Sequence, residues 1–140
     1  MQRKAALAVQ HSVVGKTLIR SNVMFELNGT HHEYDTIVIH DCAATKTSTA
    51  YIVESARSPQ PEDVAKLLQR TETYKMWAGT PNDKTVAKFV PVLGGRHISA
   101  ETIRECIARN VLRVTLSGTD YETVCANHIK LFPSHLLNEH

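Results

Sequence analysis

The sequence predicts an α/β domain with a mixed β-sheet and helices on its faces. Three observations predict this class. The chain has 140 residues, 42% of them hydrophobic, which is enough for one packed core but not comfortably for two. Segments rich in β-branched residues follow one another in the first half, separated by turn residues. In the second half, strand-like segments alternate with segments of helical periodicity, as in sheets with crossover helices.

The first half is expected to contain a helix followed by three consecutive strands. Apolar residues at spacings of three and four predict a helix over residues 3–19. An alternating run over 22–29 ends in Asn28-Gly29, a pair typical of two-residue β-hairpin turns. The second strand of this hairpin is expected at 33–40 and a third strand at 49–55.

The second half begins with a strong helix-start signal. Pro61, followed by two acidic residues, suits the first turn of a helix, and Gly79-Thr-Pro81 is expected to end that helix. A strand is then predicted over 86–93, stopped by Gly94-Gly95. Pro91 would suit a sheet edge or a strand end better than the middle of a strand.

The remaining elements are shorter. Ser99 is expected to cap a helix through Arg109, with Asn110 closing it in the left-handed conformation. The side chains that this helix is expected to bury are Ile103, Cys106 and Ile107. A strand follows at 111–115 and a final helix at 121–131. The expected order is αβββαβαβ in one domain, 1–140, with a core at about 1–116 and a C-terminal extension at 117–140.

The composition limits which partners, metal sites and cellular compartments are expected. Sixteen basic and fourteen acidic residues give a net charge of +2, which does not by itself indicate a nucleic-acid partner. No apolar run has the length of a membrane span, so no membrane partner is expected. The three cysteines are widely spaced without a CxxC pair, so they predict neither a disulfide framework nor a zinc site. An intracellular, reducing compartment fits best, with cytoplasm, nucleus and organelle left open.

Two acidic residues stand at the ends of apolar strand segments. On a strand, alternate side chains share a face, so Asp35 is expected on the face of Ile37, and Glu54 on the face of Ile52. If the second and third strands are neighbours, the two carboxylates can hold one divalent ion, with the backbone carbonyl of Ser55 as a further ligand. Such oxygen ligands suit Mg²⁺ or Mn²⁺. The ion would lower the pKa of a bound water and neutralise charge on a phosphate.

The same segments resemble a known nuclease family. They are Glu33-Tyr-Asp-Thr-Ile-Val-Ile39, then Ala50-Tyr-Ile-Val-Glu-Ser-Ala-Arg-Ser58 and the helix opening Glu62-Asp-Val64. This pattern is similar to the core of the PD-(D/E)XK, or restriction-endonuclease-like, superfamily, in which an aspartate begins one strand and a Glu-x-Lys triplet lies on the next. The resemblance covers the order of elements over residues 1–116, but as a motif only about twenty-five residues.

The resemblance implies a restriction-endonuclease-like fold and metal-dependent hydrolysis of DNA phosphodiesters, with Asp35 and Glu54 as catalytic metal ligands. The sequence departs from the family at Ala56, where the catalytic lysine is expected. Alanine carries neither a charge nor a transferable proton, so low or absent activity is expected. Three explanations stay open: a natural pseudo-enzyme, a deliberate inactivating substitution, or a basic group supplied from elsewhere.

Several basic residues are candidates for that group or for contacts with nucleic acid. Arg57 follows Ala56 but should point to the opposite face, and arginine is a poor general base that binds phosphate well. Lys66 on the following helix and Lys46 in the preceding loop are weaker substitutes. Arg57, Lys66 and His32 are the expected nucleic-acid contacts, with DNA favoured.

An alternative function is a non-catalytic pseudo-nuclease module that binds nucleic acid or a protein partner within a larger assembly. The missing lysine and the modest net charge both permit this function. A homodimer would suit symmetric cutting of a duplex, and the domain can equally belong to a longer parent protein.

Two further patterns contain residue types that occur in binding sites. His31, His32, His40 and Asp41, together with Asp35, contain metal-ligating residue types, but neighbouring histidines on a strand diverge and no His-x3-His spacing supports them. The segment Gly94-Gly95-Arg96-His97 has glycines that let a backbone approach phosphate, yet it lacks the Gly-Lys-Ser/Thr ending of a P-loop. A turn is the preferred interpretation of this segment.

Overall fold

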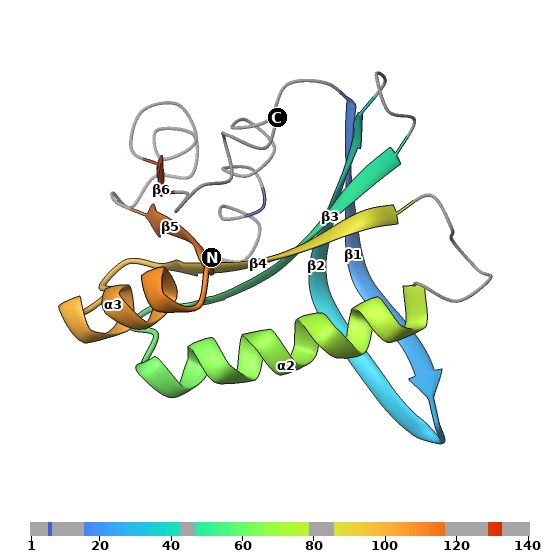
Figure 1. Ribbon diagram of the computed structural model, residues 1–140, viewed down its shortest axis with the longest axis horizontal. Helices are drawn as coiled ribbons and strands as arrows, with labels where there is room; N and C mark the ends of the chain where they lie inside the picture. Colours follow the sequence, from blue (N-terminus) through green and yellow to red (C-terminus); the bar gives the residue numbers. More distant parts are fainter. Residues whose placement is uncertain (1–5, 7–15, 43–46, 79–85, 117–128, 133–140) are drawn as a thin grey trace.

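The computed structural model describes residue 6 and residues 16–42, 47–78, 86–116 and 129–132 (Figure 1). Its elements are β1 (Lys16–Leu27), β2 (Thr30–Cys42), β3 (Thr47–Ala56), α2 (Pro61–Ala78), β4 (Val86–Gly95), α3 (Ala100–Ala108), β5 (Leu112–Leu116) and β6 (Ile129–Phe132). The α/β class predicted from the sequence is confirmed, as is the succession βββαβαβ from β1 to β5.

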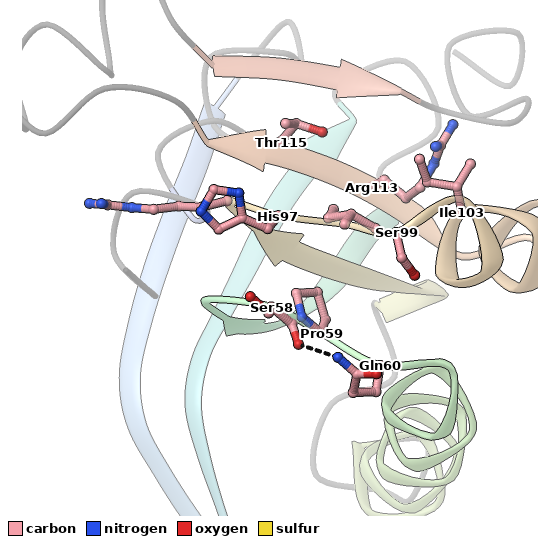
Figure 2. Close-up of a pocket in the computed structure, with 10 residues that line it drawn as sticks. Ser58, Pro59, Gln60, His97, Ser99, Ile103, Arg113 and Thr115 are labelled. Carbon is pink, nitrogen blue, oxygen red and sulfur yellow. Dashed lines mark hydrogen bonds between the residues drawn. The ribbon is translucent and has the colours of Figure 1, made fainter.

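The strands form one mixed sheet in the order β1-β2-β3-β4-β5-β6. β1, β2 and β3 are an antiparallel meander, β4 runs parallel to both β3 and β5, and β6 is antiparallel to β5. The two parallel connections pass through α2 and α3, which both lie on one face of the sheet (Figure 1). The carboxyl ends of β3, β4 and β5 therefore meet at one edge of the fold, where a pocket opens (Figure 2).

Each face of the sheet has its own hydrophobic core. The core under α2 and α3 contains β-strand residues such as Ile37 and Ile52 together with Val64 and Leu67 of α2 and Cys106 of α3. The opposite core is built from residues that alternate with these along the strands. They are Val38, Tyr51, Val53, Val92, Leu112 and Val114, joined by Ala6. Burial on both faces explains the continuous apolar runs of the central strands.

An aromatic cluster attaches the β1–β2 hairpin to α2. The ring centroids of Phe25 and Trp77 lie 4.5 Å apart, and those of Phe25 and Tyr34 lie 5.5 Å apart. The hairpin itself turns at Asn28 and Gly29, whose φ angles of 53° and 80° are the positive values that a two-residue turn requires. The predicted hairpin is thus confirmed.

In β2, the alternation of side chains between the two faces reverses near Asp35. Tyr34 and Ile37 both belong to the core under α2, although residues an odd number of positions apart on a regular strand point to opposite faces. Val38 then returns to the opposite core. The reversal therefore falls at Asp35 and Thr36.

In β1, the alternation of side chains between the two faces also reverses, at the same level of the sheet. Ile19 packs against the opposite core and Val23 against the core under α2, where regular alternation would place both on one face. Between them lies Asn22, whose φ of 54° is in the left-handed region. Asn22 stands opposite Asp35, between the register pairs Ser21–Thr36 and Val23–Tyr34. The two breaks are therefore a shared feature of the hairpin.

Two predicted helices are wrong where the structure describes them. Residues 16–19 belong to β1, because they pair with residues 38–41 of β2, and the rest of the helix expected over 3–19 lies outside the described residues, apart from Ala6. Residues 129–131 belong to β6, which adds to the sheet beside β5, so the C-terminal extension supplies a strand there. Both segments gain backbone pairing that local helical periodicity does not reveal.

β4 and α3 differ from the prediction in smaller ways. Gly94 and Gly95 continue β4, where they pair with both neighbouring strands, so they are not a turn. Pro91 lies inside β4, but the β4–β5 ladder begins only at Val92, so its missing N–H breaks no bond on that side. In α3, the expected buried residue Ile107 is 53% exposed. The capping by Ser99 is confirmed: its Oγ accepts a hydrogen bond from the backbone N–H of Thr102.

Within the described residues, no helix is long and apolar enough to span a membrane.

Candidate functional site

Asp35 and Glu54 lie on neighbouring strands, as the sequence predicts. β2 and β3 are antiparallel, and their ladder ends at the pair Thr36–Val53. Asp35 and Glu54 are the next residues on each strand, one step beyond that last pair. β2 and β3 therefore no longer pair at the level of the two acids, and a side chain from another element can reach the space between the strands.

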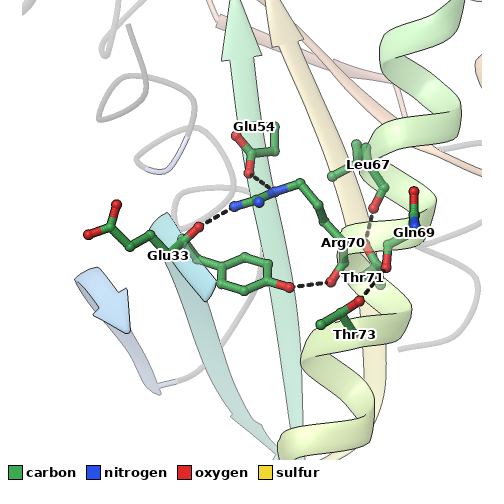
Figure 3. A network of polar contacts seen from close by, with 8 residues as sticks. Glu33, Glu54, Leu67, Gln69, Arg70, Thr71 and Thr73 are labelled. Carbon is green, nitrogen blue, oxygen red and sulfur yellow. Dashed lines mark hydrogen bonds and ion pairs between the residues drawn. The ribbon is translucent and has the colours of Figure 1, made fainter. Parts of the chain in front are cut away.

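Arg70 of α2 reaches this end of the β2–β3 ladder and contacts both strands. Its Nε donates a hydrogen bond to Oε1 of Glu54 at 2.8 Å, and the same atoms form an ion pair (Figure 3). The Arg70 side chain is 37% exposed and that of Glu54 is 27% exposed, so the pair is half-buried. The Glu54 carboxylate, expected as a metal ligand, has a protein cation as its partner.

Three further contacts hold Arg70 in place. Its Nη2 donates to the backbone carbonyl of Glu33, an acceptor on β2 beyond the end of the β3 ladder. Its guanidinium carbon lies 4.3 Å from the ring centroid of Tyr34, within the range of a cation–π contact. The Tyr34 hydroxyl in turn donates to the Arg70 carbonyl at 2.7 Å. We call Arg70, Glu54, Tyr34 and the Glu33 carbonyl the Arg70 cluster.

Burial dominates the electrostatics of Tyr34. The side chain is 1% exposed, and desolvation raises the pKa of its hydroxyl above the ordinary value, with Arg70 opposing this shift in part. The hydroxyl is therefore a neutral donor over the physiological range. The cluster combines one carboxylate, one guanidinium and one neutral phenol.

The groups around Glu54 suit the guanidinium of Arg70 better than they suit a divalent ion. A metal ion at Glu54 would stand beside the positive charge of Arg70 or would have to displace it. Asp35 is exposed and stands at the reversal of β2, and the Arg70 guanidinium lies over the ring of the preceding residue, Tyr34. Within the described residues, no group of three or more His, Cys, Asp or Glu side chains is arranged to hold a metal ion.

The other predicted site residues surround the end of β3. Ser55 and Ala56 lie opposite Gly94 and Gly95 of β4, and Ala56 is exposed. Arg57 is exposed as well, and its carbonyl accepts hydrogen bonds from the backbone of the β4–α3 loop. Lys66 is exposed on α2, one turn before Arg70. Lys46 lies outside the described residues.

The structure spreads the histidines along the hairpin. His31 stands 3.8 Å from Glu33 in a solvent-exposed pair. His32 packs against Phe25, with ring centroids 5.4 Å apart. His40 is only 4% exposed and belongs to the interior, whereas Asp41 accepts a hydrogen bond from the Ser48 hydroxyl. These contacts give the residues separate structural roles.

A second candidate region is the pocket at the carboxyl ends of β3, β4 and β5, with a volume of about 680 Å³. Its lining residues come from the two loops that lead into α2 and α3 and from β5. They are Ser58, Pro59, Gln60, Arg96, His97, Ile98, Ser99, Ile103, Arg113 and Thr115 (Figure 2). Among the described residues, the lining contains two arginines and one histidine and no acidic residue.

Sequence reasoning missed Arg70 and Arg113. Arg70 flanks the buried stripe of α2, three residues after Leu67 and four before Tyr74, a position where a long polar side chain reaches from the helix to the sheet. The available signal was thus a basic residue at the border of the stripe, combined with an acid at the end of the preceding strand. Arg113 lies in an apolar strand, and its local pattern gives no such signal.

No family model, curated protein or solved structure matches the chain.

Proposed function

We propose that the chain is a non-catalytic nuclease-type domain that binds the phosphodiester backbone of nucleic acid, with DNA favoured. The observation that carries this proposal is the ion pair between Arg70 and Glu54 at 2.8 Å. A metal-dependent nuclease of the kind that the sequence resembles needs this carboxylate for its ion and a basic group two residues later. Here the carboxylate is bound by the protein itself, and the later position is Ala56.

A metal ion at Glu54 would have to displace Arg70. A Mg²⁺ or Mn²⁺ ion that takes Glu54 as a ligand breaks the Glu54 contact, and moving the guanidinium away also gives up the Glu33 carbonyl and the Tyr34 ring. Hydrogen bonds to charged groups contribute roughly 1.5–3 kcal/mol each. Metal binding at this place is therefore expected to be weak.

Binding of nucleic acid is supported by exposed cations near the end of β3. Arg57 and Lys66 are exposed on the segment that runs from β3 into α2. Basic side chains of this kind contact phosphates without reading sequence, and their contribution falls as salt concentration rises. With a net charge of only +2, moderate affinity that depends strongly on salt is expected.

The proposal is tested by measuring duplex binding and plasmid cleavage together. We expect the wild-type protein to bind a fluorescent DNA duplex at low salt, to release it as salt is raised, and to leave supercoiled plasmid intact with Mg²⁺ or Mn²⁺. The double variant Arg57→Gln/Lys66→Gln should weaken duplex binding, and Arg20→Gln/Lys75→Gln is the charge-matched control. Metal-dependent cleavage that is lost in Glu54→Gln but kept in Glu72→Gln overturns the proposal.

A metal-dependent DNA endonuclease is the second candidate function. It is favoured by the register, because Asp35 and Glu54 stand one step beyond the Thr36–Val53 pair on adjacent strands. In this function Arg70 would release Glu54, and Mg²⁺ or Mn²⁺ would bind the two carboxylates and the Ser55 carbonyl. The cleavage assay separates the candidates, and an Ala56→Lys/Arg70→Gln variant supplies the base and frees the carboxylate. A protein partner instead of nucleic acid would appear as absence of duplex binding at low salt.

A further inference from the structure

The edge of β1 that faces away from β2 is a candidate for pairing with another polypeptide. β1 stands at one end of the sheet order, and within the described residues no strand pairs with this outer edge. The strand is 12 residues long and contains no proline. It exposes two large apolar side chains, Leu18 at 54% and Met24 at 57%. Long edge strands with exposed apolar residues are places where a further strand can add to a sheet.

Asn22 divides this outer edge into two parts. Its φ of 54° interrupts the extended backbone, so a straight partner strand cannot follow the whole of β1. The part before Asn22 contains Lys16 and Arg20, and charged side chains on an edge discourage pairing. The part over residues 23–27, which we call the arm edge, contains one charged residue, Glu26. The arm edge is therefore the less protected part.

The backbone groups of Met24 and Glu26 point outward along the arm edge. The hairpin has a two-residue turn, and the residues that flank such a turn exchange backbone hydrogen bonds. Alternation along the ladder then directs the N–H and C=O groups of Met24 and Glu26 away from β2. The carbonyl of Glu33, which stands opposite Met24, agrees with this pattern, because it accepts from Arg70 of α2.

The side chains of the same residues lie on the face of the hairpin that is turned away from α2. Val23 and Phe25 pack against the core under α2, so Met24 and Glu26 point to the opposite face. Glu33 is the cross-strand partner of Met24 and shares this face. All three side chains are exposed. The face thus presents one apolar side chain with two carboxylates beside it.

The charge of this face favours a basic partner. His31 stands opposite Glu26, and its Nε2 lies 3.8 Å from Oε1 of Glu33, in an exposed pair that is ionic only when the imidazole is protonated. A strand that adds along the arm edge would lie directly beside Glu26. A positively charged side chain at that place forms an opposite-charge cross-strand pair, which stabilises neighbouring strands.

The arm edge is held from behind by α2. The ring of Phe25 stacks on that of Trp77, with centroids 4.5 Å apart, and on that of Tyr34, with centroids 5.5 Å apart. In Figure 1 the hairpin extends past β3 and β4 and runs beside the end of α2. Because the two strands are fixed in this way, the protein loses little conformational freedom when a further strand binds.

A second copy of the chain does not suit the arm edge. Antiparallel pairing of two copies around Phe25 would place Met24 of each copy opposite Glu26 of the other. It would also gather the Glu26 and Glu33 carboxylates of both copies on one face, where like charges repel each other. The charges favour a partner of different composition.

We propose that the arm edge binds an extended segment of a partner protein, which adds to the sheet as a strand beside β1. This segment carries an apolar residue opposite Met24 and a basic residue opposite Glu26, two positions apart on one face. The backbone hydrogen bonds supply most of the affinity, and the two side chains supply the choice of sequence. The inference goes beyond the proposed function, because it concerns a polypeptide and an edge that contains neither Arg57 nor Lys66.

The probe is a short capped peptide in which a valine and a lysine stand two positions apart and threonines fill the other positions. Amide NMR spectra of the wild-type chain follow the titration. We expect shifts at the amides of Met24 and Glu26, with slower hydrogen exchange at both, because their N–H groups gain acceptors. Absence of these effects at millimolar peptide concentration overturns the inference.

Two modified peptides separate the side-chain and backbone contributions. A peptide with glutamate in place of lysine should bind roughly fivefold more weakly, because an attractive cross-strand pair becomes repulsive. A peptide that is N-methylated at the positions facing β1 should bind roughly tenfold more weakly or not at all, because it lacks the N–H donors of the ladder. Unchanged affinity of the N-methylated peptide overturns the inference.

A charge reversal in the protein gives a matched test. Glu26→Lys should abolish or invert the preference for the lysine peptide over the glutamate peptide. Glu72→Lys, at an exposed acid of α2, should keep this preference. Thermal unfolding checks that both variants keep the fold. An unchanged preference in Glu26→Lys overturns the inference.

Sedimentation of the wild-type chain tests a second copy as the occupant. We expect Met24→Thr to leave the oligomeric state unchanged, because the arm edge is not a contact between copies. A wild-type dimer that dissociates in Met24→Thr shows that a second copy covers the arm edge, and this result overturns the inference.

Discussion

At the scale of single residues, the surroundings of Glu54 decide whether its carboxylate can bind a metal ion. An acid at the end of an apolar strand is costly unless it is paired, and this cost made Glu54 a metal-ligand candidate. Arg70 satisfies the same need with one ion pair. The type and burial of Glu54 were thus readable from the sequence, but its partner was not, because the partner lies sixteen residues away on a helix whose facing depends on the packed sheet.

The coupling between Glu54 and Arg70 is measurable by a double-mutant cycle. Glu54→Gln, Arg70→Gln and the double variant should give a coupling of about 1 kcal/mol in the free energy of unfolding, since the pair is half-buried and its atoms lie 2.8 Å apart. The exposed pair of Glu105 and Arg109 on α3, 3.2 Å apart, is the control and should give less than about 0.5 kcal/mol. Equal couplings for the two pairs would argue against a special role for Arg70.

Tyr34 offers a prediction on pH. Tyr34→Phe removes the hydroxyl that donates to the Arg70 carbonyl and should cost about 1 kcal/mol at neutral pH. Burial raises the pKa of the Tyr34 hydroxyl in the folded state above 10.0. The native state therefore keeps this proton to a higher pH than the unfolded state does. The stabilisation is therefore full below pH 10 and is lost as pH rises through the folded pKa. Urea unfolding from pH 8 to 11 should show the gap between wild type and Tyr34→Phe narrowing at the alkaline end, and a constant gap would contradict this.

At the scale of elements, local signals predicted what local forces decide. The hairpin turn at Asn28-Gly29, the start of α2 at Pro61 and the cap at Ser99 were all readable, because each depends on a few adjacent residues. The extension of β1 to Lys16 depends instead on pairing with β2, and the face reversal depends on two strands at once. Such long-range effects explain why Asp35 could be placed on its strand but not on a face.

The face reversal predicts that position 22 tolerates glycine better than a β-branched residue. With φ at 54°, Asn22→Val should lower the free energy of unfolding by about 1–3 kcal/mol, because β-branched residues are strained in the left-handed region. Asn22→Gly should be nearly neutral, since glycine adopts this conformation freely. Ser21→Val, at the exposed neighbouring position, is the control and should be tolerated. Chemical denaturation checks all three, and a harmless Asn22→Val would contradict the reversal.

The contact between β4 and the β3–α2 loop gives a second prediction at this scale. Gly95→Ala should cost about 1–3 kcal/mol of stability, because the new methyl group meets Pro59 at 2.6 Å. Thermal unfolding measures this cost. Since the same contact shapes the pocket, the surviving folded protein should also show shifted amide resonances at Arg96 and His97. Unchanged stability would mean that the loop yields readily to the added methyl group.

At the scale of the whole molecule, one mixed sheet carries two separate surfaces. The Arg70 cluster lies where β2 and β3 part, and the pocket lies where the parallel strands β3, β4 and β5 end. The sequence predicted the α/β class and the neighbouring positions of β2 and β3, because both follow from the order of elements. The nuclease-type function is a proposal that stands on Asp35, Glu54 and the departure at Ala56.

The most direct test of the account is a calorimetric titration with Mn²⁺. The account predicts no Glu54-dependent binding to the wild-type protein at micromolar concentration, because Arg70 holds the carboxylate. Arg70→Gln should produce weak binding that disappears in Glu54→Gln/Arg70→Gln. Micromolar binding of Mn²⁺ to the wild-type protein that is abolished by Glu54→Gln, but not by the control Glu72→Gln, would contradict the account.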